Sequence, residues 1–247
     1  MRATTCLLSF AATLSPKESA RAMKPFVVTR VPLCLGSNST VEFHAARPVF
    51  PLNGPIIIDV AFFDTRPHAD TRLMQQAARV IYSKSSSIRF HALLTTPQNV
   101  PGFRVTLLAL PARAKCLYDN LRRLSHGPGP QYLYKPLLAW VMPLDVRKLI
   151  VLDTDVAVLR DIQSLWAEFN LFGDALIGLV NEQNNLYQKE SNWKAIGKNG
   201  GIQLLDLEAM RTSVAYASAL DLVASGQPGL RIGYLGDQTL CKWRRIP

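Results

Sequence analysis

From residue 56 onward, the hydrophobic positions alternate between two spacings, and this alternation predicts an α/β fold. Short runs rich in β-branched and aromatic residues, which are typical of buried strands, occupy positions 56–63, 88–95, 103–110, 148–152, 175–180 and 201–207. The apolar spacing of helices occurs at positions 71–83, 113–124, 132–141, 162–169 and 208–224. Alternating strands and helices predict a doubly wound, mostly parallel sheet. Ligands of such sheets bind at the carboxyl ends of the strands, near a topological switch point.

The first part of the chain has a different character. Residues 1–54 are rich in proline and show no sustained hydrophobic period, so we predict a leader or stem there and one domain over residues 55–247. Arg2 followed by a short apolar run is compatible with a weak secretory signal, and the acidic-poor stretch as far as Arg47 is equally compatible with an organelle transit peptide or with untranslated sequence. No run reaches the roughly 18–20 apolar residues of a membrane span, and membrane anchoring stays open.

Composition narrows the classes of partner. The 247 residues are 48% hydrophobic, which allows a substantial core without disulfides or structural metals. The net charge of +10 would suit an acidic partner, but the basic residues do not cluster with aromatic residues into a nucleic-acid module, so no nucleic acid is expected. The 4 cysteines form no C-x-x-C pair, which argues against a zinc site. Disulfides in a secretory compartment remain open.

Two carboxylates interrupt the apolar run at the end of the strand predicted at 148–152. Asp153 and Asp155 follow that strand directly, and unpaired carboxylates near a core need a cation or hydrogen-bond donors. In an extended chain residues i and i+2 point to the same side, so both could reach one point. Hard oxygen ligands at this spacing suit magnesium or manganese, which could hold a diphosphate leaving group. The alternative is a strand that ends in a turn, with both aspartates exposed or capping the next helix at Ile162.

The surrounding sequence makes this motif more specific. The run KLIVLDTDVAVLRDIQSLW lies among the ordered blocks IIIDVAFFD, SIRFHALLTT, YLYKPLLAWVMP, KNGGIQLLDLEAMR and YLGDQTL. Together these blocks, over about residues 56–242, resemble glycosyltransferase family 8. The resemblance implies a GT-A fold with a mixed, mostly parallel sheet, a UDP-sugar donor, manganese (or magnesium), and retention of anomeric configuration. The blocks LLDLEAMR and YLGDQ are similar to xyloside xylosyltransferases, and LWAEF and LVNEQ are similar to xylosyl/glucuronyl transferases. UDP-xylose is therefore the favoured donor.

The resemblance also implies roles for individual residues around the donor. Asp153 and Asp155 would bind the metal, with Asp153 also contacting the donor, and Lys135 would contact the donor diphosphate or sugar. Phe62, Phe63 and Asp64, at the end of the first strand, would hold the uridine. A snorkelling surface lysine, and core phenylalanines followed by a turn aspartate, are the alternatives for these positions.

Two further blocks would surround the transferred sugar. Asn199, Gly200 and Gly201 match the family's Asn-x-Gly block, in which the amide bonds sugar hydroxyls and glycine allows close approach. The alternative is a simple Asn-Gly turn. In YLGDQTL, Asp237 would accept hydrogen bonds from the sugar, and Gln238 would lie near the anomeric carbon, opposite the leaving group. Same-face transfer without a strong nucleophile is the chemistry that the family implies.

The chain departs from the family pattern in three places. The aromatic residue before the family's Asn is absent, and Thr239 replaces the last Asp of the Asp-Gln-Asp block. The sequence stops at Pro247, before the family's His-x-x-Gly-x-x-Lys block, so we expect a C-terminally truncated domain. All 4 histidines precede Asp153, and His91 is interpreted as a core residue of its strand.

These observations predict a metal-dependent transferase that moves a sugar from a UDP-sugar, xylose before glucose, galactose or glucuronate, to a glycan or glycoprotein acceptor. The expected location is the lumen of the ER or Golgi, with an organelle or the cytoplasm left open. A catalytically inactive relative that binds nucleotide or a partner protein is the alternative. An unrelated metal-dependent hydrolase is disfavoured by the order of the blocks.

Overall fold

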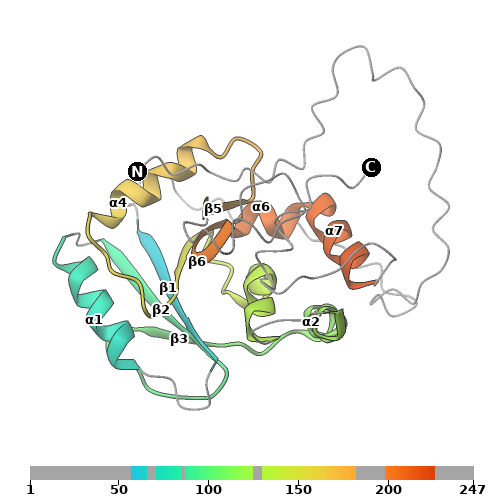
Figure 1. Ribbon diagram of the computed structural model, residues 1–247, viewed down its shortest axis with the longest axis horizontal. Coiled ribbons are helices and arrows are strands. Elements are labelled where there is room, and N and C mark those ends of the chain that lie inside the picture. Colours follow the sequence, from blue (N-terminus) through green and yellow to red (C-terminus); the bar gives the residue numbers. More distant parts are fainter. Residues whose placement is uncertain (1–56, 66–70, 85–86, 125–129, 182–197, 226–247) are drawn as a thin grey trace, which may run out of the picture.

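The computed structural model describes residues 57–65, 71–84, 87–124, 130–181 and 198–225. In this part of the chain one sheet has the strand order β3-β2-β1-β4-β6-β5 (Figure 1). The strands are β1 (Ile58–Asp64), β2 (Ile88–Leu94), β3 (Arg104–Leu107), β4 (Lys148–Leu152), β5 (Ile177–Asn181) and β6 (Lys198–Asp206). The predicted leader, residues 1–54, lies outside the described residues.

The order of the strands creates a topological switch point. From β1 the chain winds outward in one direction through β2 and β3, and it returns to the other side of β1 to form β4. β1 pairs in parallel with both β2 and β4, whereas β6 is antiparallel to both of its neighbours. The sheet is therefore mixed and mostly parallel, which confirms the predicted fold class. The carboxyl ends of β1 and β4 lie side by side, where such sheets bind ligands.

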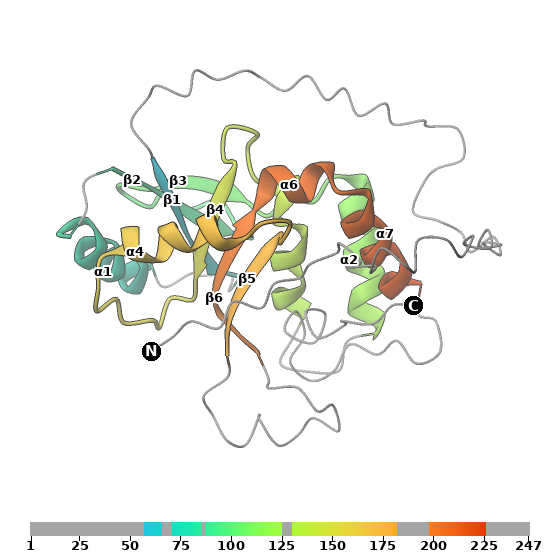
Figure 2. The ribbon, with the colours of Figure 1, turned by 90° about the horizontal axis from the view of Figure 1, so that it is seen from above.

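Helices cover both faces of the sheet and enclose two hydrophobic cores (Figures 1 and 2). Alternate residues of β1 supply the two cores, with Ala61 and Phe63 on one face and Val60 and Phe62 on the other. The helices α1 (Thr71–Tyr82), α4 (Ile162–Trp166) and η2 (Ala167–Leu171) contribute to the Phe62 face. The helices α2 (Ala112–Leu124), η1 (Pro130–Leu137), α3 (Leu138–Val141), α6 (Leu207–Thr212) and α7 (Val214–Ala224) contribute to the Phe63 face.

Two predicted helices are each divided in the structure. The helix expected at 132–141 is a 3-10 helix, η1, followed by the single turn α3, and Pro136, which has no N–H to donate, lies within η1. The helix expected at 208–224 breaks at Ser213, where α6 ends and α7 begins. The Ser213 hydroxyl accepts a hydrogen bond from the Tyr216 N–H and so caps α7. The prediction of one continuous helix there was wrong because a local cap competes with helix continuation.

Charged side chains at the amino edge of the sheet, of which Asp59 and His91 are buried, form a paired network. Asp59 of β1 accepts hydrogen bonds from Arg89 of β2 at 2.5 and 3.0 Å, and it lies 2.7 Å from His91 Nε2. Arg89 and Arg104 both donate to Asp145 at 2.8 Å. Burial alone would raise the pKa of Asp145, but the two guanidinium groups outweigh it and hold this pKa below its usual value. His91 is fully buried, as its predicted core role requires.

Within the residues that the structure describes, no helix is long and apolar enough to cross a membrane.

Asp206 provides a test of the packing at the end of β6. Its carboxylate caps α6 by accepting a hydrogen bond from the Ala209 N–H at 2.9 Å. Burial raises the pKa of this carboxyl, because the ionised form is disfavoured in the folded state. The contribution of Asp206 to stability is therefore greatest below the ordinary carboxyl pKa, and it declines as the pH rises through the raised pKa. Asp206→Asn keeps an acceptor without the charge and should leave the free energy of unfolding at pH 7 unchanged or raised, as measured by urea titration.

The matched variant is Asp206→Ala, which removes the cap and should lower the free energy of unfolding by about 1 kcal/mol. In acid, where Asp206 is protonated in both states, any advantage of the Asn variant should disappear. Equal destabilisation by Asn and Ala at pH 7 would show that the carboxylate charge itself stabilises α6.

Candidate functional site

Asp153 lies at the switch point, immediately after β4. Its N–H donates to the Gly201 carbonyl at 2.9 Å, which ties the end of β4 to the start of β6. β4 ends at Leu152, and Thr154 and Asp155 form a turn. The expectation that Asp153 and Asp155 share one side of an extended chain was therefore wrong, because the strand ends before both of them. The Asp153 side chain is 32% exposed, and Asp155 is exposed.

Lys135 of η1 points at Asp153 rather than into solvent. Its side chain is 1% exposed, and Nζ donates to Asp153 Oδ1 at 2.8 Å and to the Gly200 carbonyl at 2.7 Å. Burying an ammonium group is tolerated only when it has such partners. The structure therefore excludes the alternative of a snorkelling surface lysine.

The residues Asn199, Gly200 and Gly201 lie beside this ion pair. The register of β6 against β5 shifts here, since Leu179 is opposite Gln203 and Val180 is opposite Asn199. Such a bulge re-aims the chain, and bulges are common beside active sites. The Gly201 N–H donates to Asn199 Oδ1 at 2.8 Å, so the predicted Asn-Gly turn is also present.

Gly201 packs too closely against its neighbours to carry a side chain. A Cβ atom there would lie 3.1 Å from Asn199 Oδ1 and 3.3 Å from Asp153 Oδ2. Both distances are tighter than ordinary van der Waals contact, so glycine allows the close approach of the Asp153 carboxylate to β6.

The residues predicted at the end of β1 divide between the core and the site. Phe62 is fully buried, and its ring packs with those of Phe90 and Phe103 in the core. Phe63 lies on the opposite face with its ring centroid 5.8 Å from Lys135 Nζ. Asp64 is buried at the carboxyl end of β1, two residues beyond the Phe62–Leu152 pairing. Of the three, Phe63 lies beside Lys135, the partner of Asp153.

Sequence reasoning missed the aromatic surroundings of Lys135. The Tyr132 ring centroid lies 5.7 Å from Lys135 Nζ, because side chains three residues apart nearly eclipse in a 3-10 helix. Tyr134 packs against Phe63 and Tyr118. Burial raises the pKa of Tyr118 to about 12, so this hydroxyl adds no charge near neutral pH. The signal was present in the YLYK sequence, whose first tyrosine precedes the lysine by three positions.

The metal-binding capacity of the site rests on two carboxylates. No group of three or more His, Cys, Asp or Glu side chains that could hold a metal occurs in the described part of the chain. Asp153 Oδ1 is bonded to Lys135, and the Asp153 side chain is 32% exposed. Asp153 Oδ2 and the exposed Asp155 are hard oxygen donors that fit magnesium or manganese, provided water or a diphosphate completes the coordination. Asp237 and Gln238 lie outside the described residues.

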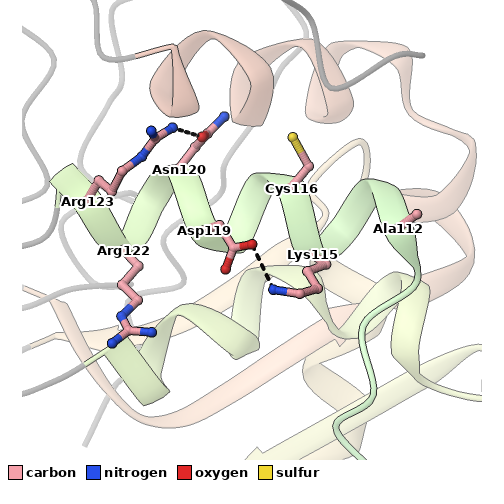
Figure 3. Close-up of a pocket in the computed structure, with 7 residues that line it drawn as sticks. All are labelled: Ala112, Lys115, Cys116, Asp119, Asn120, Arg122 and Arg123. Carbon is pink, nitrogen blue, oxygen red and sulfur yellow. Dashed lines mark hydrogen bonds and ion pairs between the residues drawn. The ribbon is translucent and has the colours of Figure 1, made fainter.

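A separate concavity of about 900 Å³ occurs on α2. Its lining includes Lys115, Arg122, Arg123 and Cys116, and it shares no residue with the cluster around Asp153. Figure 3 shows that these side chains diverge to different sides of the helix. Lys115 is paired with Asp119 at 2.8 Å. The concavity has no convergent polar groups.

Known proteins resemble the chain both in sequence and in structure, although no protein-family model matches it. The xylosyl- and glucuronyltransferase LARGE1 of Danio rerio is 38% identical over 95 residues, which cover 35% of this chain and 12% of that protein. LARGE2 of Rattus norvegicus is 39% identical over 95 residues, or 35% of this chain and 14% of the relative. The match thus spans only a small part of these relatives.

Solved structures resemble the chain over a larger part of its length. Mouse xyloside xylosyltransferase 1 aligns with a TM-score of 0.54 at 18% identity, covering 75% of this chain and 80% of that one. The galactosyltransferase LgtC, solved with donor and acceptor sugar analogs, aligns with a TM-score of 0.53 at 16% identity, covering 74% and 69%.

The fold is therefore that of the GT-A glycosyltransferases, and the predicted resemblance to enzymes of the family 8 type is confirmed. The relatives found by sequence and the neighbours found by structure are both glycosyltransferases.

Gly201→Ala tests whether the close packing of Gly201 against Asp153 is needed for ligand binding. The added methyl would press on Asp153 Oδ2 and Asn199 Oδ1, and we expect manganese-dependent UDP binding to weaken about tenfold, since a good charge-assisted contact contributes ~1–3 kcal/mol. Isothermal titration calorimetry with MnCl2 and UDP measures this effect.

Gly178→Ala is the matched control. Its methyl would meet the Phe172 ring at 3.0 Å in the core, so it should lower the free energy of unfolding by about 1–3 kcal/mol and leave UDP affinity unchanged. Equal UDP affinity in the Gly201→Ala variant and the unmodified chain would mean that ligand binding does not need this close packing against Asp153.

Proposed function

We propose that this chain is a glycosyltransferase that moves a sugar from a UDP-sugar to a glycan or glycoprotein acceptor, with retention and with manganese or magnesium. The observation that carries the proposal is the convergence of Lys135, Asp153 and Gly200 at the switch point of a GT-A sheet. Three segments that are distant in sequence meet there, and neither of the two hydrogen bonds of Lys135 serves the strand pairing.

The chemistry of the site suits a nucleoside diphosphate. Metal held at Asp153 and Asp155 would neutralise the charge that develops on a leaving diphosphate. Asp64 and the Phe63 ring would border the uridine, and Asn199, Gly200 and Gly201 would border the sugar. Phe62 would support that edge from the core.

The residues proposed to act at the anomeric carbon are Asp237 and Gln238. Asp237 would accept hydrogen bonds from sugar hydroxyls, and the neutral amide of Gln238 would stabilise developing positive charge on the face opposite the leaving group. Both roles come from the resemblance of the YLGDQTL block.

Xylose is the proposed donor sugar, with glucose, galactose and glucuronate as alternatives. The relatives found by sequence are named xylosyl- and glucuronyltransferases, and a structural neighbour is named a xyloside xylosyltransferase. A screen of the four UDP-sugars that measures release of UDP tests this order. UDP binding without release from any donor would favour the alternative of an inactive, nucleotide-binding relative.

A secretory compartment is the proposed location. Cys116 on α2 is disulfide-bonded, and disulfides persist in oxidising compartments. This feature and the likeness to glycan-modifying transferases favour the lumen of the ER or Golgi.

Asp155→Ala tests the metal-dependent donor site. Because the exposed Asp155 belongs to no other described interaction network, the variant should fold normally and lose manganese-dependent UDP binding by at least about tenfold. Calorimetric titration of UDP, with manganese and with EDTA, measures the change.

The control is Asp174→Ala, another exposed carboxylate, which lies before β5 near the opposite edge of the sheet. It should bind UDP as the unmodified chain does. Metal-independent UDP binding of equal strength in the Asp155→Ala variant would refute the proposed role of this carboxylate.

The disulfide supports a separate prediction. In the chain purified from the secretory pathway of a eukaryotic host, Cys116 should resist alkylation by iodoacetamide until a reductant is added, because its sulfur is already bonded. Peptide mapping by mass spectrometry measures the label at this residue. Full labelling of Cys116 before reduction would remove this argument for an oxidising compartment.

A further inference from the structure

The ammonium group of Lys135 already has partners within the protein. Its ammonium group is withdrawn from solvent, 1% exposed, and is bonded at 2.8 Å to a carboxylate oxygen and at 2.7 Å to a backbone carbonyl. The Phe63 and Tyr132 rings lie 5.8 and 5.7 Å from Nζ. These contacts place a fixed positive charge directly against the first carboxylate of the Asp-Thr-Asp motif.

That charge affects any cation that uses the same carboxylate. Lys135 engages Asp153 Oδ1, and the Asp153 side chain is 32% exposed, so a cation is left with Oδ2. The ammonium also cancels one of the negative charges that Asp153 and Asp155 bring to this edge of the sheet. The Lys135 ammonium repels a divalent cation, and this repulsion is stronger near a protein interior than in water. The free protein should therefore bind a divalent cation weakly.

A nucleotide diphosphate changes this balance. It brings negative charge and additional oxygen ligands for the cation to the same edge. The negative charge of the diphosphate replaces the charge of Asp153 that Lys135 neutralises. Coupling between two ligands is reciprocal, so the metal would strengthen nucleotide binding by the same factor.

We infer that Lys135 is an internal counter-cation that makes metal binding at Asp153 depend on the nucleotide diphosphate. This inference rests on the proposed function, and it assigns Lys135 a role beyond contact with the donor. The pair with Asp153 lowers the net negative charge that a cation meets in the free protein, and the cation and the nucleotide then bind together. Lys135 acts through Asp153 and is a positioning residue.

The experiment measures manganese binding to the full chain without donor turnover. The free Mn²⁺ signal in electron paramagnetic resonance is titrated with and without UDP, for the unmodified chain, Lys135→Met and Lys135→Arg. Methionine is unbranched and one heavy atom shorter than lysine, so it fills most of the same space among the aromatic rings and removes the charge and its two hydrogen bonds. Arginine keeps the charge and is the matched control.

In the unmodified chain, UDP should strengthen Mn²⁺ binding at least about tenfold. In Lys135→Met, binding of Mn²⁺ without UDP should tighten by about tenfold or more, and the strengthening by UDP should shrink in proportion. Lys135→Arg should retain the coupling. Circular dichroism verifies that each variant is folded, and Lys135→Gln replaces the Met variant if that protein is unfolded.

Two results would overturn the inference while leaving the proposed function intact. One is equal Mn²⁺ affinity of the unmodified chain with and without UDP. The other is unchanged or weaker Mn²⁺ binding in both neutral Lys135 variants. The failure of the proposed function has a different signature, in which Asp153→Asn and Asp155→Ala bind Mn²⁺ and UDP as the unmodified chain does.

Discussion

The ion pair between Lys135 and Asp153 is the interaction on which the organisation of the site depends. A buried ammonium group needs a negative partner and a carbonyl, and these requirements hold η1, the end of β4 and the bulge of β6 in one place. The Asp153 N–H adds a backbone bond to Gly201, so the same carboxylate-bearing residue is fixed at both its side chain and its main chain. Loss of the pair would therefore affect three elements.

The two edges of the sheet use buried charge differently. At the amino edge, Asp59 is shared by Arg89 and His91, and Asp145 is shared by Arg89 and Arg104, so carboxylates are matched by several donors. At the carboxyl edge, Lys135 bonds one oxygen of Asp153, whose side chain stays 32% exposed. A closed network stabilises a fold, whereas a partly exposed carboxylate retains the capacity to bind a ligand.

Particular segments show how far the sequence alone could predict this structure. The buried strands were predicted from uninterrupted apolar runs, and β4 begins and ends where the pattern KLIVL indicated. The break at Ser213 and the 3-10 helix around Pro136 were missed, since a local cap and a missing N–H override apolar periodicity. The pairing of Asp153 with Asp155 on one side of a strand was also wrong, because a turn replaces the extended chain.

The sequence by itself determined which residue types follow the buried strands, and hence the chemistry that this edge of the sheet can perform. Its ordered blocks also indicated the GT-A fold, which depends on apolar periodicity and strand order. Only the tertiary structure decided that Lys135 bonds Asp153 and Gly200, that Phe62 belongs to the core, and that Gly201 packs closely against the Asp153 carboxylate. These features depend on contacts between segments as far as 65 residues apart, which local patterns do not encode.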